Sequence, residues 1–149
     1  MKPTRDTLRS VHIDAGADRV FDALATAAGL AGWWTTRVDR VPGDRPRLRL
    51  WWSETDHTTM RVDRLDPPRR IEWTCVDQWD RNLPDPREWV GTRILFDLRE
   101  RDEGTEVTVR HAGLLALDCA EQCDLGWSRF LRESLKPFVE QGAGQPLRV

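Results

Sequence analysis

Two aromatic-rich amphipathic segments stand at opposite ends of this chain and constrain its fold more than any other feature. The first reads VHIDAGADRVFDALATAAGLAGWW and the second GWSRFLRESLKPFVEQGAGQP. Between them lie about ninety residues, many of them with strand-like alternation of apolar and polar side chains. A chain that opens on a strand and two helices, continues through hairpins and closes on one long helix can wrap its sheet around that helix. We therefore expect an α+β fold with a candidate small-molecule pocket between sheet and helix.

Period-two alternation defines the expected strands. Residues 8–13 open the sheet, and residues 38–41 form an edge strand that Pro42 and Gly43 stop. One apolar face is typical of an antiparallel sheet covered on one side. In the hairpins that follow, the positions expected on that face are Leu48, Leu50, Trp52, Met60, Val62, Ile71, Trp73, Cys75, Asp77, Ile94, Phe96, Leu98, Val107, Val109 and His111.

Helical spacing marks three further segments. Residues 17–24 predict a short amphipathic helix, and Thr26 is placed to cap a second one that ends at Trp33 and Trp34. A long helix is expected from about Asp118 to Glu140. Pro137 should distort its last turn. Its apolar stripe is Cys119, Cys123, Trp127, Leu131, Leu135 and Phe138.

Composition narrows the classes of function. The chain has 149 residues, which predicts one domain spanning 1–149. A net charge of −2 with both signs interspersed argues against nucleic acid as a partner. The opening residues MKPTRDTLRS contain no apolar stretch and the sequence has no run of 18 apolar residues, so we expect neither a secretory leader nor membrane insertion. Three cysteines in such a chain favour reduced thiols and a cytoplasmic location.

Cofactor and nucleophile motifs are missing from the sequence. It contains no tyrosine, no phosphate loop, no dinucleotide fingerprint, no H-E-x-x-H and no G-x-S-x-G. The three histidines are scattered singly, so two helix cysteines would lack partner ligands for a metal. We therefore expect neither a metal nor a cofactor, and assign no catalytic residue.

Three pieces of the sequence resemble the START-like (SRPBCC, helix-grip) superfamily, and within it the group homologous to the activator of the heat-shock-protein-90 ATPase. They are residues 13–34, the Ile71-Glu72-Trp73 strand, and the stretch from Gly126 to Gly142. The resemblance implies a curved antiparallel sheet wrapped around the C-terminal helix, with two short N-terminal helices closing one end. It also implies hydrophobic-ligand carriers, aromatases or cyclases, and chaperone regulators as relatives, so it does not decide the activity.

Strand parity and helix faces nominate the lining of the expected cavity. An aromatic wall with few polar groups suits a flat hydrophobic ligand. The same large side chains would equally serve as ordinary core. The candidate ligand-binding residues are Trp33, Trp34, Trp52, Met60, Trp73, Cys75, Asp77, Phe96, His111, Trp127 and Leu131.

Three functions stay open at this point. The first is non-catalytic binding of a small hydrophobic or aromatic ligand. The second is a protein-interaction module or homodimer contact, with Trp51 or Trp89 as exposed anchors. The third is an enzyme acting on an aromatic or polyketide-like substrate, with His111 and Asp77 as acid and base. The long connection over residues 79–91 is expected either to cover the pocket mouth or to serve as a solvated crossing.

Overall fold

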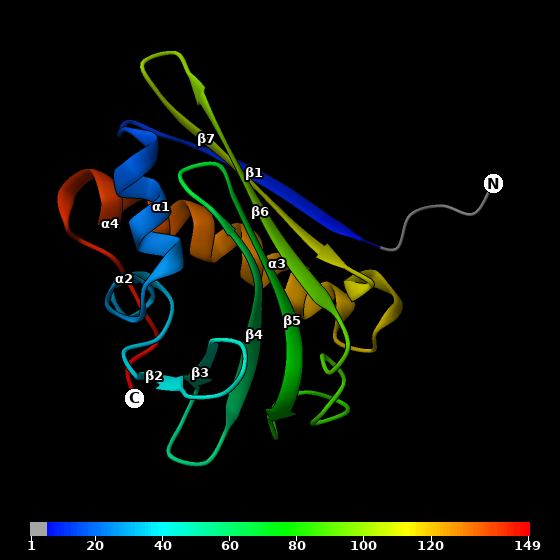
Figure 1. Ribbon diagram of the computed structural model, residues 1–149. Helices are drawn as coiled ribbons and strands as arrows, with labels where there is room; N and C mark the ends of the chain where they lie inside the picture. Colours follow the sequence, from blue (N-terminus) through cyan, green and yellow to red (C-terminus); the bar gives the residue numbers. More distant parts are fainter. Residues whose placement is uncertain (1–5) are drawn as a thin grey trace.

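The computed structural model describes residues 6–149, in which seven strands form one antiparallel sheet against a helical layer (Figure 1). The sheet order is β1-β7-β6-β5-β4-β3-β2, so the first strand lies beside the last and every other neighbour is a hairpin partner. The strands are β1 (Thr7–Ile13), β2 (Val38–Val41), β3 (Arg47–Trp51), β4 (His57–Asp66), β5 (Arg70–Trp79), β6 (Arg93–Arg101) and β7 (Gly104–Ala112). The α+β helix-grip expectation is confirmed.

The two short helices follow β1 directly. Helix α1 (Ala17–Ala25) buries Val20, Phe21 and Leu24, as its spacing predicted. Thr26 caps α2 (Ala27–Trp33), because its side-chain oxygen accepts a hydrogen bond from the Gly29 amide at 2.9 Å. Figure 1 shows both helices gathered at one end of the curved sheet, next to the C-terminal end of the long helical run.

That helical run begins slightly later than expected and is not uniform. A 3₁₀ turn, η1 (Leu114–Ala116), precedes α3 (Ala120–Phe130), which continues through a π-helical turn, η2 (Leu131–Leu135), into α4 (Lys136–Gln141). Pro137 explains the change of winding: it has no amide hydrogen, and its ring excludes ordinary α-helical packing on the turn before it. The distortion predicted for the last turn lies instead in the turn before Pro137, and the last turn is α-helical. Gly142, with φ of 70°, ends the run.

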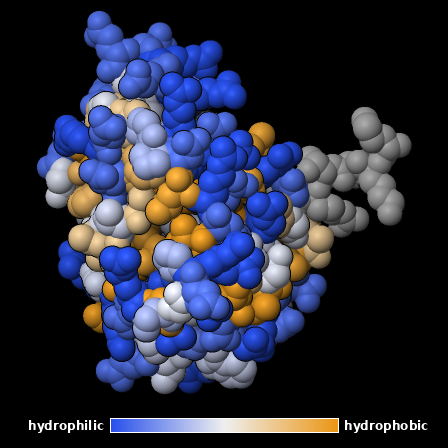
Figure 2. All heavy atoms as spheres, in the orientation of Figure 1, coloured by the Kyte–Doolittle hydropathy of each residue, from blue (hydrophilic) through white to orange (hydrophobic). Residues whose placement is uncertain are grey.

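The outer face of the sheet carries ion pairs between arginines and acidic side chains. On this face Asp63 pairs with Arg61 and Arg45, and Glu72 pairs with Arg64, Arg70 and Arg93. In the space-filling view, hydrophilic residues cover most of the visible face, with small groups of hydrophobic residues between them (Figure 2).

The opposite face of the sheet packs on the helices and forms the core. Its largest fully buried side chains include Trp33, Trp73, Phe96, Leu114 and Leu131. Within residues 6–149, no helix has the length and the apolar character needed to cross a membrane.

Candidate functional site

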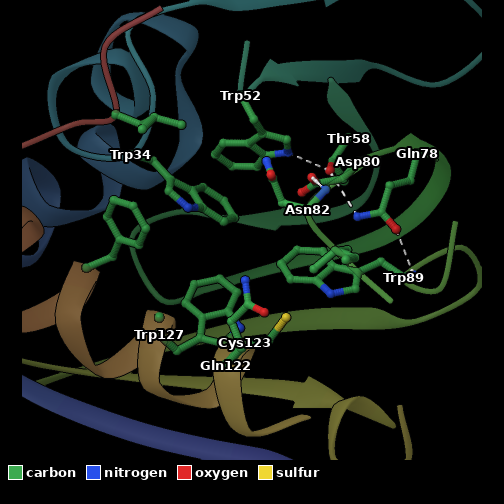
Figure 3. Close-up of a pocket in the computed structure, with 14 residues that line it drawn as sticks. Trp34, Trp52, Thr58, Gln78, Asp80, Asn82, Trp89, Gln122, Cys123 and Trp127 are labelled. Carbon is green, nitrogen blue, oxygen red and sulfur yellow. Dashed lines mark hydrogen bonds between the residues drawn. The ribbon is translucent and has the colours of Figure 1, made fainter. Parts of the chain in front are cut away.

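A pocket of about 360 Å³ opens at the end of the sheet where β4 begins and β5 finishes (Figure 3). Its walls come from β4, β5, the connection after β5, helix α3 and the C-terminal tail. The lining residues are Trp34, Trp52, Thr58, Gln78, Asp80, Asn82, Leu83, Trp89, Gln122, Cys123, Gly126, Trp127, Phe130 and Leu147. The site thus combines residues from the whole length of the chain.

Strand β5 extends beyond its pairing with β6 at the end that borders the pocket. This strand pairs with β6 only from Arg70 to Thr74, whereas it stays paired with β4 as far as Trp79. Beyond Thr74, the connection over residues 80–92 fills part of the gap between β5 and β6, and the Cys75 amide bonds to the carbonyl of Thr92 at 2.9 Å. Gln78, on the part of β5 that runs beyond β6, and Trp89, in this connection, both line the pocket.

Four indoles from separate segments form the pocket walls. Trp34 caps the end of α2, Trp52 follows β3, Trp89 belongs to the 80–92 connection, and Trp127 lies on α3. Trp34 is the hub: its ring centroid lies 5.1 Å from that of Trp127 and 5.6 Å from that of Trp52. Edge and tilted contacts of this kind hold the rings in fixed orientations, which makes the walls preorganised.

The inner end of the pocket is polar and internally bonded. Thr58 Oγ1 accepts hydrogen bonds from Trp52 Nε1 at 2.8 Å and from Gln78 Nε2 at 3.3 Å. Gln78 Oε1 accepts from the Trp89 amide at 2.9 Å. The dashed lines in Figure 3 follow this chain of bonds from one wall to the other. These side chains therefore present a fixed set of dipoles to the pocket.

The expectation that Asp77 faces inward is wrong, and a β-bulge is the reason. Thr59 pairs with Asp77 but the next residue, Met60, pairs with Cys75, so Val76 is left without a partner. The extra residue reverses the alternation. Gln78 therefore faces the pocket, while the Asp77 carboxylate lies on the other side and pairs with Arg87 at 3.1 Å.

The connection that follows β5 forms one pocket wall and is held by its own turns. Asp80 Oδ1 accepts from the Asn82 amide at 2.9 Å, and the Asp80 amide bonds to the Pro86 carbonyl at 3.0 Å. In Figure 3 the side chains of Asp80 and Asn82 point into the space between Trp52 and Trp89. Trp89 is only 9% exposed, so the expectation that it is an exposed anchor is wrong: it packs into the interior.

His111 faces inward but lies beneath the pocket, not in its wall. Its Nδ1 accepts a hydrogen bond from Trp127 Nε1 at 3.1 Å, and its Nε2 lies 2.9 Å from Thr92 Oγ1. Burial lowers the pKa of His111 from 6.5 to about 3. The ring is neutral at pH 7 with both nitrogens engaged, which makes it a structural connector between β7 and α3.

Two cysteines sit at the start of α3, where Cys119 precedes the helix and Cys123 lines the pocket. Their thiols interact with each other, which raises the pKa of Cys119 and lowers that of Cys123. The third cysteine, Cys75, is buried in the core, and burial raises the pKa of its thiol to about 12. Cys75 is therefore a poor nucleophile at neutral pH.

The predicted site residues divide into three groups. Trp34, Trp52 and Trp127 line the pocket, and Asp77 faces away. The others are closed core side chains that support the walls; Trp73, for example, stacks against Trp34 with centroids 6.2 Å apart. These core residues are Trp33, Met60, Trp73, Cys75, Phe96, His111 and Leu131.

Several residues that line the pocket were not predicted from the sequence. One face of α3 lines the pocket, and it consists of residues 122, 123, 126, 127 and 130. The predicted apolar stripe shares only Cys123 and Trp127 with this face. The tail residue Leu147 enters because its amide bonds to the Trp34 carbonyl at 2.9 Å, a long-range pairing that no local pattern reveals. For Asp80 and Trp89, the only indication in the sequence was their place in the long connection over residues 79–91, which was expected to cover the pocket mouth as one of two alternatives.

The chain matches a known protein family and is similar to solved structures. The sequence matches the family described as "Activator of Hsp90 ATPase homolog 1-like protein" over residues 14–140. The chain is similar to the solved Aha1 dimer from Colwellia psychrerythraea, with 25% identity, a TM-score of 0.76, and coverage of 93% of this chain and 98% of that one. No curated protein matched it.

Two further structures share the fold at lower identity. SSP2350 from Staphylococcus saprophyticus has 19% identity and a TM-score of 0.69, with 95% of this chain and 96% of that chain covered. DynU16, from the dynemicin biosynthetic locus, has 17% identity and a TM-score of 0.71. That match covers 99% of this chain but only 52% of DynU16, so this chain spans about half of that protein.

Proposed function

Starting from a chain that belongs to the Activator of Hsp90 ATPase homolog 1-like family and has the START-like fold, we propose that it binds a small, flat, hydrophobic ligand without transforming it. The ligand occupies the pocket between the end of the sheet and α3. One observation carries the proposal: four indoles from four separate segments enclose a cavity of about 360 Å³, within the range typical of small-molecule sites.

The shape of the walls supports a planar ligand. Trp34 and Trp127 are each only 3% exposed, so the residual surface they offer is ring surface inside the pocket. Their ring centroids lie 5.1 Å apart, so the two rings form one aromatic wall, and a flat ligand laid on it removes apolar area from water, a gain of roughly 25 cal/mol per Å² before ordering costs. The Thr58 and Gln78 side chains at the inner end supply orientation through hydrogen bonds.

The enzyme alternative loses support because its acid and base do not meet. His111 is a buried neutral ring bonded to Trp127, and Asp77 pairs with Arg87 on the other side of the sheet. No described side chain among the pocket residues reproduces that pair. We therefore place binding ahead of catalysis, and we propose the reducing cytoplasm as the setting, in keeping with three free cysteines.

Self-association is a second proposal, favoured by exposed leucines at the β1 edge of the sheet. Leu8 on β1 is 63% exposed and Leu125 on α3 is 60% exposed, and they flank the ion pair between Arg9 and Asp124. Light scattering after size exclusion tests this proposal. A dimer that Leu8→Asp converts to a monomer supports it, and a monomeric wild type at high micromolar concentration rejects it.

Ligand binding is tested by filling the pocket from a position that tolerates a side chain. Gly126 lines the pocket on α3, and a Cβ placed there meets nothing within 4 Å. We expect native mass spectrometry of gently purified wild type to show a small-molecule adduct, and we expect Gly126→Leu to keep the fold and to lose that adduct. Arg129→Leu, on an exposed part of the same helix, is the matched control. Equal adduct in both variants, or none in wild type together with no binding of any flat aromatic probe, contradicts the proposal.

A further inference from the structure

The pocket contains one carboxylate and no basic side chain, and this imbalance constrains the charge of the ligand. Among the lining residues within the described chain, Asp80 is the acidic group, and arginine, lysine and histidine are absent. The other lining groups are indoles, a phenyl ring, hydroxyl and amide groups, a thiol and aliphatic carbon. An anion entering this space would meet uncompensated negative charge.

The Asp80 carboxylate is uncompensated within residues 6–149. It forms no ion pair there, although its neighbours do: the nearby Asp56 pairs with Arg81 at 3.3 Å and Asp77 pairs with Arg87 at 3.1 Å. Asp80 Oδ1 accepts a hydrogen bond from the Asn82 amide at 2.9 Å, and the Asn82 side chain also interacts with this carboxylate, so the groups that bond to it are neutral donors. Burial, with the charge of Asp56, raises the pKa of Asp80. A positive group beside it would relieve this cost.

The aromatic rings around Asp80 are suited to the same kind of group. A cation held against indole faces gains from the ring quadrupole, and tryptophan gives the strongest such interaction of the aromatic side chains. Trp34, Trp52, Trp89 and Trp127 all border the pocket, and Figure 3 shows Asp80 between two of these rings. The Asx turn with Asn82 fixes the carboxylate in that place, so the arrangement does not need to form on binding.

We infer that the pocket selects an organic cation, a protonated amine or quaternary ammonium group on a flat apolar body, with Asp80 as the counter-charge. This inference rests on the proposed binding function and narrows it to one charge class. The apolar body would lie against Trp34 and Trp127, and the cationic group would lie at the polar end near Asp80 and Trp52. Neutral analogues of the same shape should bind more weakly, and anions most weakly.

Three probes of nearly equal shape test the inference: tryptamine (cation), tryptophol (neutral) and indole-3-acetate (anion), each titrated calorimetrically at pH 7. We expect tryptamine to bind about tenfold more tightly than tryptophol and indole-3-acetate to bind more weakly than tryptophol. Asp80→Asn should bring the tryptamine dissociation constant to within about twofold of that of tryptophol in the same variant. Asp44→Asn, in an exposed turn, should change none of the three.

A second variant separates the ring contribution from the charge contribution. Trp52→Leu keeps an apolar side chain but removes a π-face, so tryptamine should lose more affinity than tryptophol. Equal affinities of the three probes for wild type overturn the cation assignment while leaving the binding function intact. Preserved tryptamine preference in Asp80→Asn overturns the role of Asp80. If none of the three probes binds at millimolar concentration, both the inference and the proposed pocket fail for ligands of this size.

Discussion

The indole Nε1–H of Trp127 donates to Nδ1 of His111 across 3.1 Å, joining α3 to β7 inside the core. This bond fixes the imidazole tautomer, because a nitrogen that accepts carries no proton. The proton therefore sits on Nε2, which faces Thr92 Oγ1 at 2.9 Å, and the Thr92 hydroxyl in turn donates to the Trp89 carbonyl at 2.6 Å. One chain of bonds thus supports two walls of the pocket.

Protonation of His111 should couple folding to pH. Its folded pKa is about 3 against 6.5 for the free side chain, so the unfolded chain binds the proton first as pH falls. The stabilising effect of the neutral ring is complete above pH 6.5 and is lost between there and pH 3, with a slope of about 1.4 kcal/mol per pH unit. Urea unfolding at pH 7, 6, 5 and 4 measures it.

His111→Gln is the comparison for that series, because glutamine can accept and donate at the same place without titrating. Its unfolding free energy should fall less steeply with decreasing pH than that of wild type, by the equivalent of one proton. If the unfolding free energy fell equally steeply with decreasing pH in both proteins, the assignment of His111 as a buried neutral ring would be contradicted. Nitrogen chemical shifts of the wild-type imidazole provide a check that does not depend on the variant: they should report the neutral Nε2–H tautomer from pH 7 down to pH 4.

Asp80 should have the opposite pH dependence. Burial raises its folded pKa above the unfolded value, so its contribution is most favourable below the unfolded pKa and is lost as pH rises through the folded pKa. Asp80→Asn should therefore raise the melting temperature of the ligand-free protein at pH 7 and have less effect at pH 4. Differential scanning fluorimetry measures both, with Asp44→Asn as control. A lower melting temperature for Asp80→Asn at pH 7 would count against the uncompensated carboxylate.

Two glycine-to-alanine changes should act in opposite directions. A Cβ at Gly29 would collide with backbone atoms of Asp22 and Ala23 in α1, so Gly29→Ala should force the two helices apart and cost about 1–3 kcal/mol. A Cβ at Gly126 meets nothing within 4 Å, and in a helix interior alanine is favoured over glycine by about 1 kcal/mol. Denaturant unfolding measures the free energy of unfolding of both variants. A change of the same sign in both would contradict the argument that Gly29 is closely packed and Gly126 is not.

Glu140 should connect the end of the helical run to the β1–α1 turn. Its Oε2 accepts from the Asp14 amide at 2.8 Å and from Lys136 Nζ at 2.6 Å. These bonds lower the pKa of Glu140, so their stabilisation is present above the unfolded pKa and is lost as pH falls through the lower folded value. Glu140→Gln should be less stable than wild type at pH 7 and should approach it near pH 3. If the unfolding midpoints of wild type and Glu140→Gln differed by the same amount at every pH, the stabilising role of the Glu140 charge would be contradicted.

Local patterns predicted much of the fold from the residues themselves. The edge strand at residues 38–41 and the Thr26 cap both depend on side chains within a few positions of one another, and both are observed. The aromatic character of the cavity region was also foreseeable, because the tryptophans stand at strand ends and helix faces. Which of those tryptophans face open space was not foreseeable.

The bulge at Val76 illustrates what local alternation misses. The order of apolar and polar residues in the strand does not reveal an unpaired residue. The bulge nevertheless turns Asp77 away from the pocket and brings Gln78 into it. The same holds for Leu147, which reaches the pocket through pairing of the tail with residues 34–36. Both depend on pairing partners distant in the sequence.

The sequence by itself determined the order and kind of the elements, the apolar faces and the family resemblance, because these follow from short-range periodicity and spacing. Only the tertiary structure decided that Trp34, Trp52, Trp89 and Trp127 enclose a space while Trp73 and Phe96 fill one. Whether a cavity remains depends on how side-chain volumes from the sheet, α3, the 80–92 connection and the tail add up in three dimensions. That sum is a property of the packed chain as a whole.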